Sequence, residues 1–308
     1  MTSYRLLTAE EIPSAVQLWV EVFAVEAEFF NSLLRGGDAD DFSVGAFEEG
    51  RIVSSVHVFM RWFRDREGRP QKVGGIGSVS TLPDHRAKGH SSKLLALAIE
   101  GMAARGCVWS YLGTGVNPHY ARAGWRTVST PYFTGHSKPV TDSVELQKQP
   151  VTDWLLEQMA VVHTDYSRSR PMANDRSPAI WSHAVRYRVS RPEDEVFARF
   201  SGTDLTAYLV CNRNQEGVEL VEATCLTGFE DDLQNLARQR IASASGQVTS
   251  SLEEGGPAHL AFMEACSRVT RREDLAWMVR PIANGVGFPE LMAIQGDPRG
   301  RRSGLDNF

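Results

Sequence analysis

The stretch VSTLPDHRAKGHSSKLLALAIEGM, residues 79–102, decides the fold. A β-rich segment runs into Pro83 and a basic loop, and the apolar residues after the loop recur at the spacing of one helix face. The pattern predicts a strand, a short loop and a long amphipathic helix. Backbone N–H groups in the first turn of a helix lack partners within the helix, and the aligned peptide dipoles place about half a positive charge there. We therefore expect an anion to bind where the loop meets the helix.

The composition of the loop favours a pyrophosphate. Arg86 and Lys88 add positive charge, and Gly89 lets the chain turn and lets a ligand approach the backbone. Ser91 and Ser92 add small hydroxyl donors. Two other nucleotide-binding loops do not fit, because GGIGSV lacks the last glycine of GxGxxG and no GxxxxGK[ST] occurs.

Length and charge limit the class of protein. The chain has 308 residues, whereas one domain typically has on the order of 100–150, so we expect two domains. The 33 Lys and Arg residues against 38 Asp and Glu give a net charge of −5, which argues against a nucleic-acid partner or an anionic membrane. No stretch approaches the roughly 18 apolar residues of a membrane span. We therefore expect a cytoplasmic location.

The cysteines indicate neither a disulfide framework nor a structural zinc site. They are scattered and have no CxxC or Cys/His spacing. Buried apolar thiols are the favoured interpretation, and we expect no metal cofactor. The four residues are Cys107, Cys211, Cys225 and Cys266.

The order of elements predicts an α/β protein with a mixed central sheet flanked by helices. A helix, several strands, the loop-to-helix unit, a further strand and a short helix follow one another before residue 137. Residues 206–241 then repeat the strand, turn, strand and helix pattern without a basic glycine loop. We expect domains at 1–140 and 141–295, and a polar tail at 296–308, either mobile or docked on the surface.

The segment HRAKGHS, residues 85–91, resembles the R/Q-x-x-G-x-G/A signature with which GCN5-related N-acetyltransferases (the GNAT superfamily) grip the pyrophosphate of acetyl-coenzyme A. With LGTGVNPHYARAGWRTV, residues 112–128, the sequence resembles the Eis (enhanced intracellular survival) branch of that superfamily. The branch has a catalytic domain, a second domain of the same fold without its own cofactor loop, and a third domain similar to sterol carrier proteins. The resemblance implies tandem GNAT folds with a degenerate second copy, and we expect the third domain to be lacking here.

The resemblance also implies a set of residues that bind acetyl-coenzyme A, the co-substrate. In the family, backbone groups of the strand before the loop bind the pantetheine arm and the thioester carbonyl, and the loop and the helix start bind the pyrophosphate. The matching strand residues are Val79, Ser80 and Thr81. The matching loop and helix residues are Arg86, Ala87, Lys88, Gly89, His90, Ser91 and Ser92.

Tyr120 matches the tyrosine that serves as general acid in the family. A phenol, with a pKa of about 10, stays protonated at neutral pH and can donate its proton to the coenzyme A sulfur. Packing of this tyrosine against Trp125 is the alternative, and His119 is a weaker candidate for proton transfer.

The candidates for the general base are carboxylates. We expect the acceptor pocket between the first helices and the catalytic strands, where residues 25–41 combine acidic and aromatic side chains suited to a cationic amine. Glu28 is the candidate from this segment. Proteins of the Eis branch place their terminal carboxylate in the active site, so the resemblance makes Phe308 a second candidate.

The expected function is transfer of acetyl from acetyl-coenzyme A to a primary amine of a small molecule, such as an antibiotic-like or biosynthetic amine. A protein lysine stays open as the acceptor, and a homo-oligomer stays open as the assembly. The pyrophosphate loop recognises the coenzyme and not the acyl group, so an acyltransferase or decarboxylase that uses another acyl-coenzyme A is an alternative. A coenzyme-binding protein without turnover is another.

Overall fold

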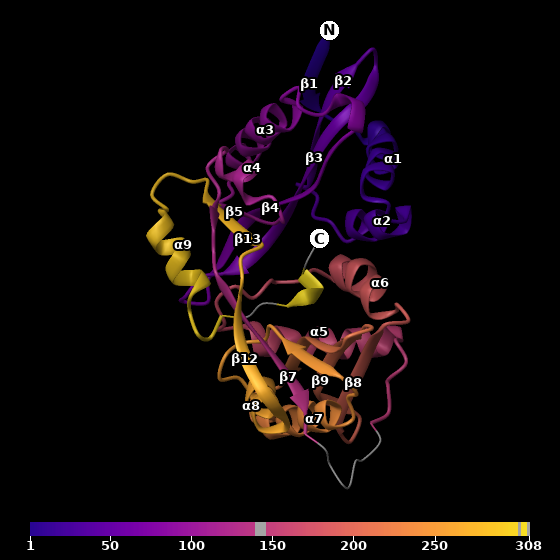
Figure 1. Ribbon diagram of the computed structural model, residues 1–308, viewed down its shortest axis with the longest axis vertical. Coiled ribbons are helices and arrows are strands. Elements are labelled where there is room, and N and C mark those ends of the chain that lie inside the picture. The colour runs from indigo at the N-terminus through magenta and orange to yellow at the C-terminus, as the bar shows by residue number, and fades with distance from the viewer. Residues whose placement is uncertain (139–145, 301–302, 307–308) are drawn as a thin grey trace.

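The computed structural model describes residues 1–138, 146–300 and 303–306. In these residues, two mixed β-sheets follow one another along the long axis of the molecule, and helices flank both (Figure 1). The α/β class predicted from the sequence is confirmed. No helix of the described parts has the length and apolar character needed to cross a membrane.

The first sheet forms the half of the molecule drawn at the top of Figure 1. Its strands are, in spatial order, β1 (Thr2–Leu6), β2 (Phe42–Glu48), β3 (Arg51–Arg64), β4 (Pro70–Thr81), β5 (Trp109–Gly113), β13 (Trp277–Pro281) and β6 (Arg126–Thr127). The helices and short turns of this half are η1 (Ala9–Glu11), α1 (Ile12–Phe23), α2 (Ala27–Arg35), η2 (Pro83–His85), α3 (His90–Ala104), α4 (Asn117–Ala121) and α9 (Phe288–Gln295).

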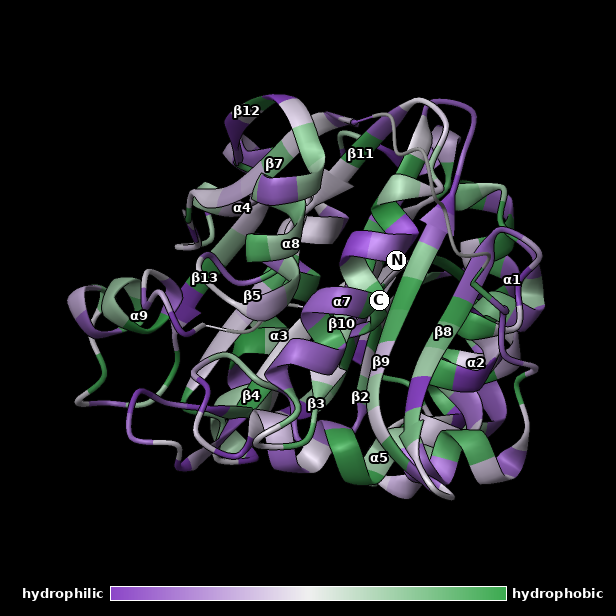
Figure 2. Ribbon diagram, turned by 90° about the horizontal axis from the view of Figure 1, so that it is seen from below, coloured by the Kyte–Doolittle hydropathy of each residue, from purple (hydrophilic) through white to green (hydrophobic). Residues whose placement is uncertain are grey.

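The second sheet forms the other half. Its strands are, in spatial order, β12 (Cys266–Asp274), β7 (Thr130–Ser137), β11 (Gln247–Ser250), β10 (Gly217–Cys225), β9 (Asp204–Arg213) and β8 (Asp194–Ser201). Its helical segments are α5 (Asp153–Ser167), η3 (Ile180–Val185), α6 (Arg186–Val189), α7 (Glu230–Ala242), α8 (Pro257–Ala265) and η4 (Gly304–Asp306). Hydrophobic residues follow β9 through the middle of this half, and hydrophilic residues colour much of α7 (Figure 2).

The predicted amphipathic helix is α3, and its apolar stripe packs on the first sheet. Leu94, Leu95, Ala98 and Met102 are each 0% exposed. The helix ends at Ala104, two residues before Gly106. Packing of this stripe fixes where the helix begins and so where its exposed first turn lies.

The two halves exchange one strand each. β7, which precedes the interdomain segment in the chain, pairs with β11 and β12 of the second sheet. β13, from the other end of the chain, pairs with β5 and β6 of the first sheet. In Figure 1 the exchange is visible as a magenta strand among orange ones below and an orange strand beside β5 above. The predicted boundary between residues 140 and 141 lies outside the described residues, and membership of the sheets does not divide there.

The second sheet repeats the plan of the first. Each sheet has one parallel pair, β4 with β5 and β10 with β11, and one helix, α3 or α7, connects each pair. The repeat expected over residues 206–241 is therefore present. In both sheets the parallel pair is the place where the connecting helix begins beside the strand ends.

The predicted polar tail is partly docked. Ser303 and Leu305 are 7% and 6% exposed. The guanidinium of Arg176, whose side chain is 0% exposed, donates to the Asp306 carboxylate at 2.7 Å and pairs with Glu222 of β10 at 2.5 Å. This buried ion network holds residues 303–306 at the junction of the two halves.

Candidate active site

The two parallel strands of the first sheet pair only over a short distance. β4 and β5 pair over Val73–Gly75 and Trp109–Tyr111, whereas β4 continues to Thr81. Ser78 has a left-handed backbone, with φ 49°, where the register with β3 shifts. A bulge of this kind bends its strand. Beyond Gly75, the edge of β4 that faces β5 has no strand partner among the described residues, so its backbone groups are available to a ligand.

Val79, Ser80 and Thr81 lie on this unpaired part of β4. On its other edge, Ser54 Oγ donates to the Ser80 carbonyl and lies 2.7 Å from Thr81 Oγ1, and Ser55 Oγ lies 3.0 Å from Ser80 Oγ. Val79 packs against the core of the first half. The side chains thus hold the strand in place, and the free edge offers only main-chain groups.

The basic loop forms a concave main-chain surface. Ala87 and Gly89 both have left-handed backbones, with φ 61° and 80°. Alternation of such residues turns successive N–H groups to one side and creates an anion-binding hollow. A Cβ at Gly89 would meet no atom within 4 Å, which leaves room for a ligand. Arg86 Nε donates to the Thr81 carbonyl at 3.2 Å, so this cation lies where the strand enters the loop, and Lys88 is exposed beside it.

The first residues of α3 have different surroundings. Ser92 is exposed, and Ser91 Oγ lies 2.8 Å from His119 Nε2 of α4. His90 is 4% exposed, and its ring points inward. Of His90, only the backbone N–H can therefore contribute to an anion site. The Ser91–His119 contact ties the proposed pyrophosphate helix to the helix that carries Tyr120.

Tyr120 is buried beside the end of β5. It is 8% exposed, and its ring lies edge-on to Trp125 with 6.4 Å between the ring centroids. Burial raises the pKa of Tyr120, and a hydrogen bond with Thr114 opposes the rise only in part. The hydroxyl therefore stays protonated at neutral pH and can donate a proton. The packing interpretation and the proton-donor interpretation are compatible.

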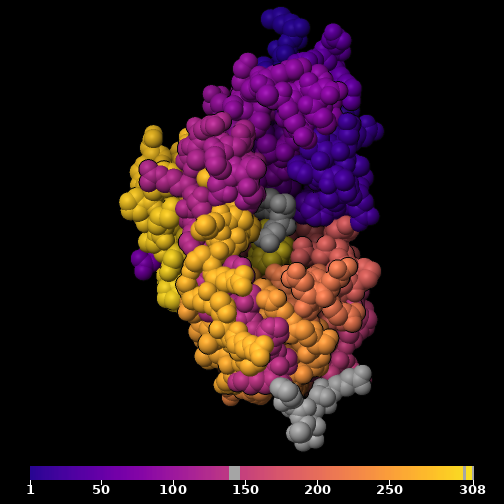
Figure 3. All heavy atoms as spheres, in the orientation of Figure 1, coloured from indigo at the N-terminus to yellow at the C-terminus, as the bar shows by residue number. Residues whose placement is uncertain are grey.

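A cavity of about 430 Å³ lies between the two sheets. The two halves meet across the middle of the face drawn in Figure 3. Tyr111 and Gly113 of β5 form part of the wall, so the cavity borders the strand that pairs with β4. Aromatic and acidic side chains from both halves line it: Phe63, Tyr111, Tyr132, Trp277, Glu219, Asp274 and Asp306.

The comparison with protein families identifies the domain that has this geometry. Residues 3–128 match the model of the acetyltransferase (GNAT) domain. These residues form a GNAT acetyltransferase domain. The assignment confirms the expectation that the chain carries an acyltransferase. Among curated proteins, the comparison found no match to this chain.

Solved structures share the fold of both halves. A GCN5-related N-acetyltransferase from Anabaena variabilis has a TM-score of 0.68 at 16% identity, over 92% of this chain and 73% of that chain. Eis1 from Mycobacterium abscessus has a TM-score of 0.62 at 15% identity, over 92% and 74% of the two chains. A tandem GNAT protein from the clavulanic acid biosynthesis pathway has a TM-score of 0.53 at 10% identity, over 93% and 100%. The tandem fold predicted from the sequence is confirmed.

The cavity differs in place from the acceptor pocket predicted for the GNAT domain. The sequence suggested a pocket bordered by residues 25–41, whereas this cavity lies between the sheets and borders residues 303–306. A smaller hollow of about 250 Å³ lies beside α1, near Glu11 and Glu21. The second half supplies much of the larger cavity, and no local pattern in residues 1–140 indicates that contribution.

The two carboxylates predicted as bases have different outcomes. The Glu28 side chain is 54% exposed and pairs with Arg35 on the same face of α2. Phe308 lies outside the described residues. Within residues 25–41, the acidic side chain that is largely buried belongs to Asp41. Its carboxylate lies 3.8 Å from Arg61 Nη1 and 4.0 Å from His57 Nε2.

This buried group of Asp41, His57 and Arg61 was not predicted from the sequence. Burial raises the pKa of Asp41 to about 6 and lowers the pKa of His57 to about 3. The ring of His57 is held by Ser43, with 2.8 Å between Oγ and Nδ1. Positions 57 and 61 differ by an even number within β3, so His57 and Arg61 point to one face of the sheet. This spacing could have indicated a shared polar group.

Proposed function

We propose that the protein transfers the acetyl group of acetyl-coenzyme A to a primary amine of a small molecule. The observation that best supports this proposal is the basic loop at the start of α3, in which Ala87 and Gly89 have left-handed backbones, next to the unpaired edge of β4. N–H groups of this loop and the Arg86 cation suit a pyrophosphate, and the main chain of Val79–Thr81 suits an extended amide-bearing arm.

The reaction needs one bond made, one bond broken and two proton movements. The amine nitrogen attacks the thioester carbonyl carbon, the carbon–sulfur bond breaks, the amine loses a proton to a base and the departing thiolate gains one. Tyr120 is the proposed donor to the thiolate, because its burial keeps the hydroxyl protonated. The Ser91–His119 contact holds the donor helix against the coenzyme helix. The residue that takes the amine proton stays a prediction, with Glu28 and Phe308 as the candidates.

The cavity between the halves is the proposed acceptor site. Its volume of about 430 Å³ falls within the range of small-molecule pockets, roughly 300–1,000 Å³. The carboxylates of Glu219 and Asp274 and the ring of Trp277 favour a cationic amine through ion pairing and cation–π contact. Membership of the Eis branch, a cytoplasmic location and a homo-oligomer stay predictions.

A coupled assay tests the proposed function. The full chain is incubated with acetyl-coenzyme A and a panel of amines that includes aminoglycosides, polyamines and a lysine-containing peptide. Release of free thiol is measured, and the products are identified by mass spectrometry. We expect thiol release that depends on a small amine, and one acetylated product. Faster turnover with propionyl- or malonyl-coenzyme A would support the alternative acyl donors. Coenzyme binding without thiol release across the panel would contradict an enzyme of this kind.

A further inference from the structure

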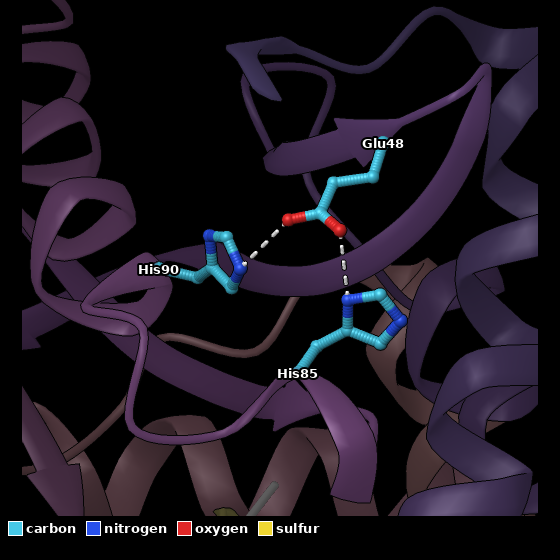
Figure 4. A group of neighbouring side chains, drawn as sticks. All are labelled: Glu48, His85 and His90. Atoms are coloured by element: carbon cyan, nitrogen blue, oxygen red, sulfur yellow. Dashed lines mark ion pairs between the residues drawn. The ribbon is translucent and has the colours of Figure 1, made fainter. Parts of the chain in front are cut away.

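Three side chains with metal-binding atoms converge beside the basic loop (Figure 4). Glu48 lies at the end of β2, His85 at the end of η2, and His90 at the start of α3. Glu48 Oε2 lies 3.0 Å from His85 Nδ1, and Glu48 Oε1 lies 3.3 Å from His90 Nε2. The ligand atoms of all three residues lie within 4.8 Å of one another.

His90 supplies the observation that points to a ligand. Its side chain is 3% exposed, and its Nε2 faces Glu48 without making a hydrogen bond. The other ring nitrogen, Nδ1, lies 2.9 Å from the Tyr4 hydroxyl. When the Tyr4 hydroxyl accepts a hydrogen bond from Nδ1–H, Nε2 presents a lone pair toward the carboxylate, and a cation between the two gives Nε2 a partner. A polar partner on the far ring nitrogen is the usual companion of a histidine that binds metal.

The spacing and the donor types select a class of ion. A tetrahedral ion with bonds of about 2.0–2.1 Å separates its ligand atoms by about 3.3–3.4 Å, and the 3.3 Å between Glu48 Oε1 and His90 Nε2 matches this separation. Two imidazoles and one carboxylate suit Zn²⁺ and related transition metals, whereas Mg²⁺ and Ca²⁺ prefer oxygen ligands. The thiols do not compete for the ion, since all four cysteines are buried.

We propose that Glu48, His85 and His90 bind one Zn²⁺ or a similar divalent transition metal, with water in the fourth position. His85 and His90 stand on either side of residues 86–89, so the ion joins both ends of the basic loop to β2. It thereby restrains the loop in the conformation that presents its N–H groups. This last step rests on the proposed coenzyme site, and the metal site itself does not.

Metal titration tests the site without acetyl-coenzyme A. The full chain is stripped with a chelator and titrated with Zn²⁺ by calorimetry and with Co²⁺ by visible absorption. We expect one ion per chain and the intense bands of tetrahedral Co²⁺. Glu48→Gln and His85→Gln should each weaken binding by at least about tenfold, and Tyr4→Phe by about 10–100-fold through loss of the outer hydrogen bond. His136→Gln, at an exposed histidine of β7, is the matched control and should bind as the wild type does.

Two results would overturn the site: no binding at micromolar metal, or equal binding by His85→Gln and the wild type. His85 is partly exposed, so its replacement tests the site even where a change at buried His90 prevents folding. The link to the loop has its own measurement. Zn²⁺ should tighten acetyl-coenzyme A binding, and the coenzyme should tighten Zn²⁺ binding by the same factor. Equal coenzyme affinity with and without Zn²⁺ removes the link, and absence of coenzyme binding in both states contradicts the proposed function instead.

Discussion

Tyr120 packs edge-on against Trp125 and carries a hydroxyl whose pKa is raised by burial. Tyr120→Phe keeps the ring and removes the hydroxyl. We expect kcat to fall by on the order of 10²–10⁴, the usual contribution of general acid catalysis, with little change in coenzyme affinity. Steady-state kinetics with a true acceptor at saturating acetyl-coenzyme A measure the effect, and Tyr187→Phe in the second half is the control. A wild-type kcat, where chemistry limits turnover, would exclude Tyr120 as the acid.

Asp41 predicts a pH dependence of stability. Its folded pKa of about 6 lies above the value of about 3.9 for an unfolded chain. The folded state therefore holds the proton more tightly, and this stabilisation is present below pH about 4 and is lost as pH rises through about 6. Asp41→Asn keeps a neutral side chain throughout. Relative to the wild type, the variant should gain up to about 3 kcal/mol in free energy of unfolding between pH 4 and pH 7.

Urea denaturation at pH 4, 5, 6 and 7 measures this difference. His57 is present in both proteins, so its own titration largely cancels in the comparison. Asp84→Asn, at an exposed position of η2, is the control and should follow the wild type. A difference between Asp41→Asn and the wild type that does not change with pH would contradict the buried-acid interpretation.

Single residues show what the sequence could and could not predict. Tyr120 and Arg86 stand in motifs with fixed local spacing, so both could be proposed as site residues from the sequence alone. The inward turn of His90 and the exposure of Glu28 depend on packing against β2 and on the position of α2, which are tertiary facts. The Glu48 contribution to the metal cluster depends on the meeting of β2 with α3, which no local spacing encodes.

At the scale of elements, the two halves differ in the turn that starts the connecting helix. The first turn of α3 has no acidic residue, whereas α7 begins with Glu230, Asp231 and Asp232. Acidic groups at a helix start complement the dipole and repel a phosphate. The Thr227 backbone N–H of the second loop already donates to Asp165 at 3.0 Å. We therefore predict that the second half binds no coenzyme.

Calorimetry should accordingly find one acetyl-coenzyme A per chain. Arg86→Ala should weaken that binding by about 1.5–3 kcal/mol, roughly tenfold or more, because the variant loses a charge-assisted hydrogen bond. Arg51→Ala, at an exposed position on β3, is the control and should leave the affinity unchanged. A second bound coenzyme, or full affinity in Arg86→Ala, would place the site elsewhere.

The elements themselves were predicted where their signals are local. The apolar stripe of α3 and the strand-and-turn pattern of residues 206–226 can be recognised from local residue patterns. Exchange of β7 and β13 was not predicted, because short apolar strands carry no signal for the sheet that they join. Their partners are set by pairing across more than 100 residues of chain.

At the scale of the whole molecule, Arg176 joins the second sheet to the end of the chain through Glu222 and Asp306. Arg176→Met fills similar space but leaves the buried Glu222 carboxylate without its cation. We expect a loss of about 3–5 kcal/mol in free energy of unfolding, as for other broken buried pairs. Denaturant unfolding measures the loss, and Arg168→Met, with a side chain 74% exposed, should change it by less than about 1 kcal/mol. Equal stability of Arg176→Met and the wild type would show that the network contributes nothing.

The exchange of β7 and β13 also determines when each sheet can be completed during synthesis of the chain. A ribosome adds about 5–20 residues per second, so β13 emerges roughly 10–30 s after β5. During that interval β5 presents an open edge on the side where β13 later pairs. Open edges invite pairing with other chains. The GNAT domain of this protein thus completes its sheet only after nearly all of the second half has been synthesised, and until then a nascent chain exposes the β5 edge to other chains.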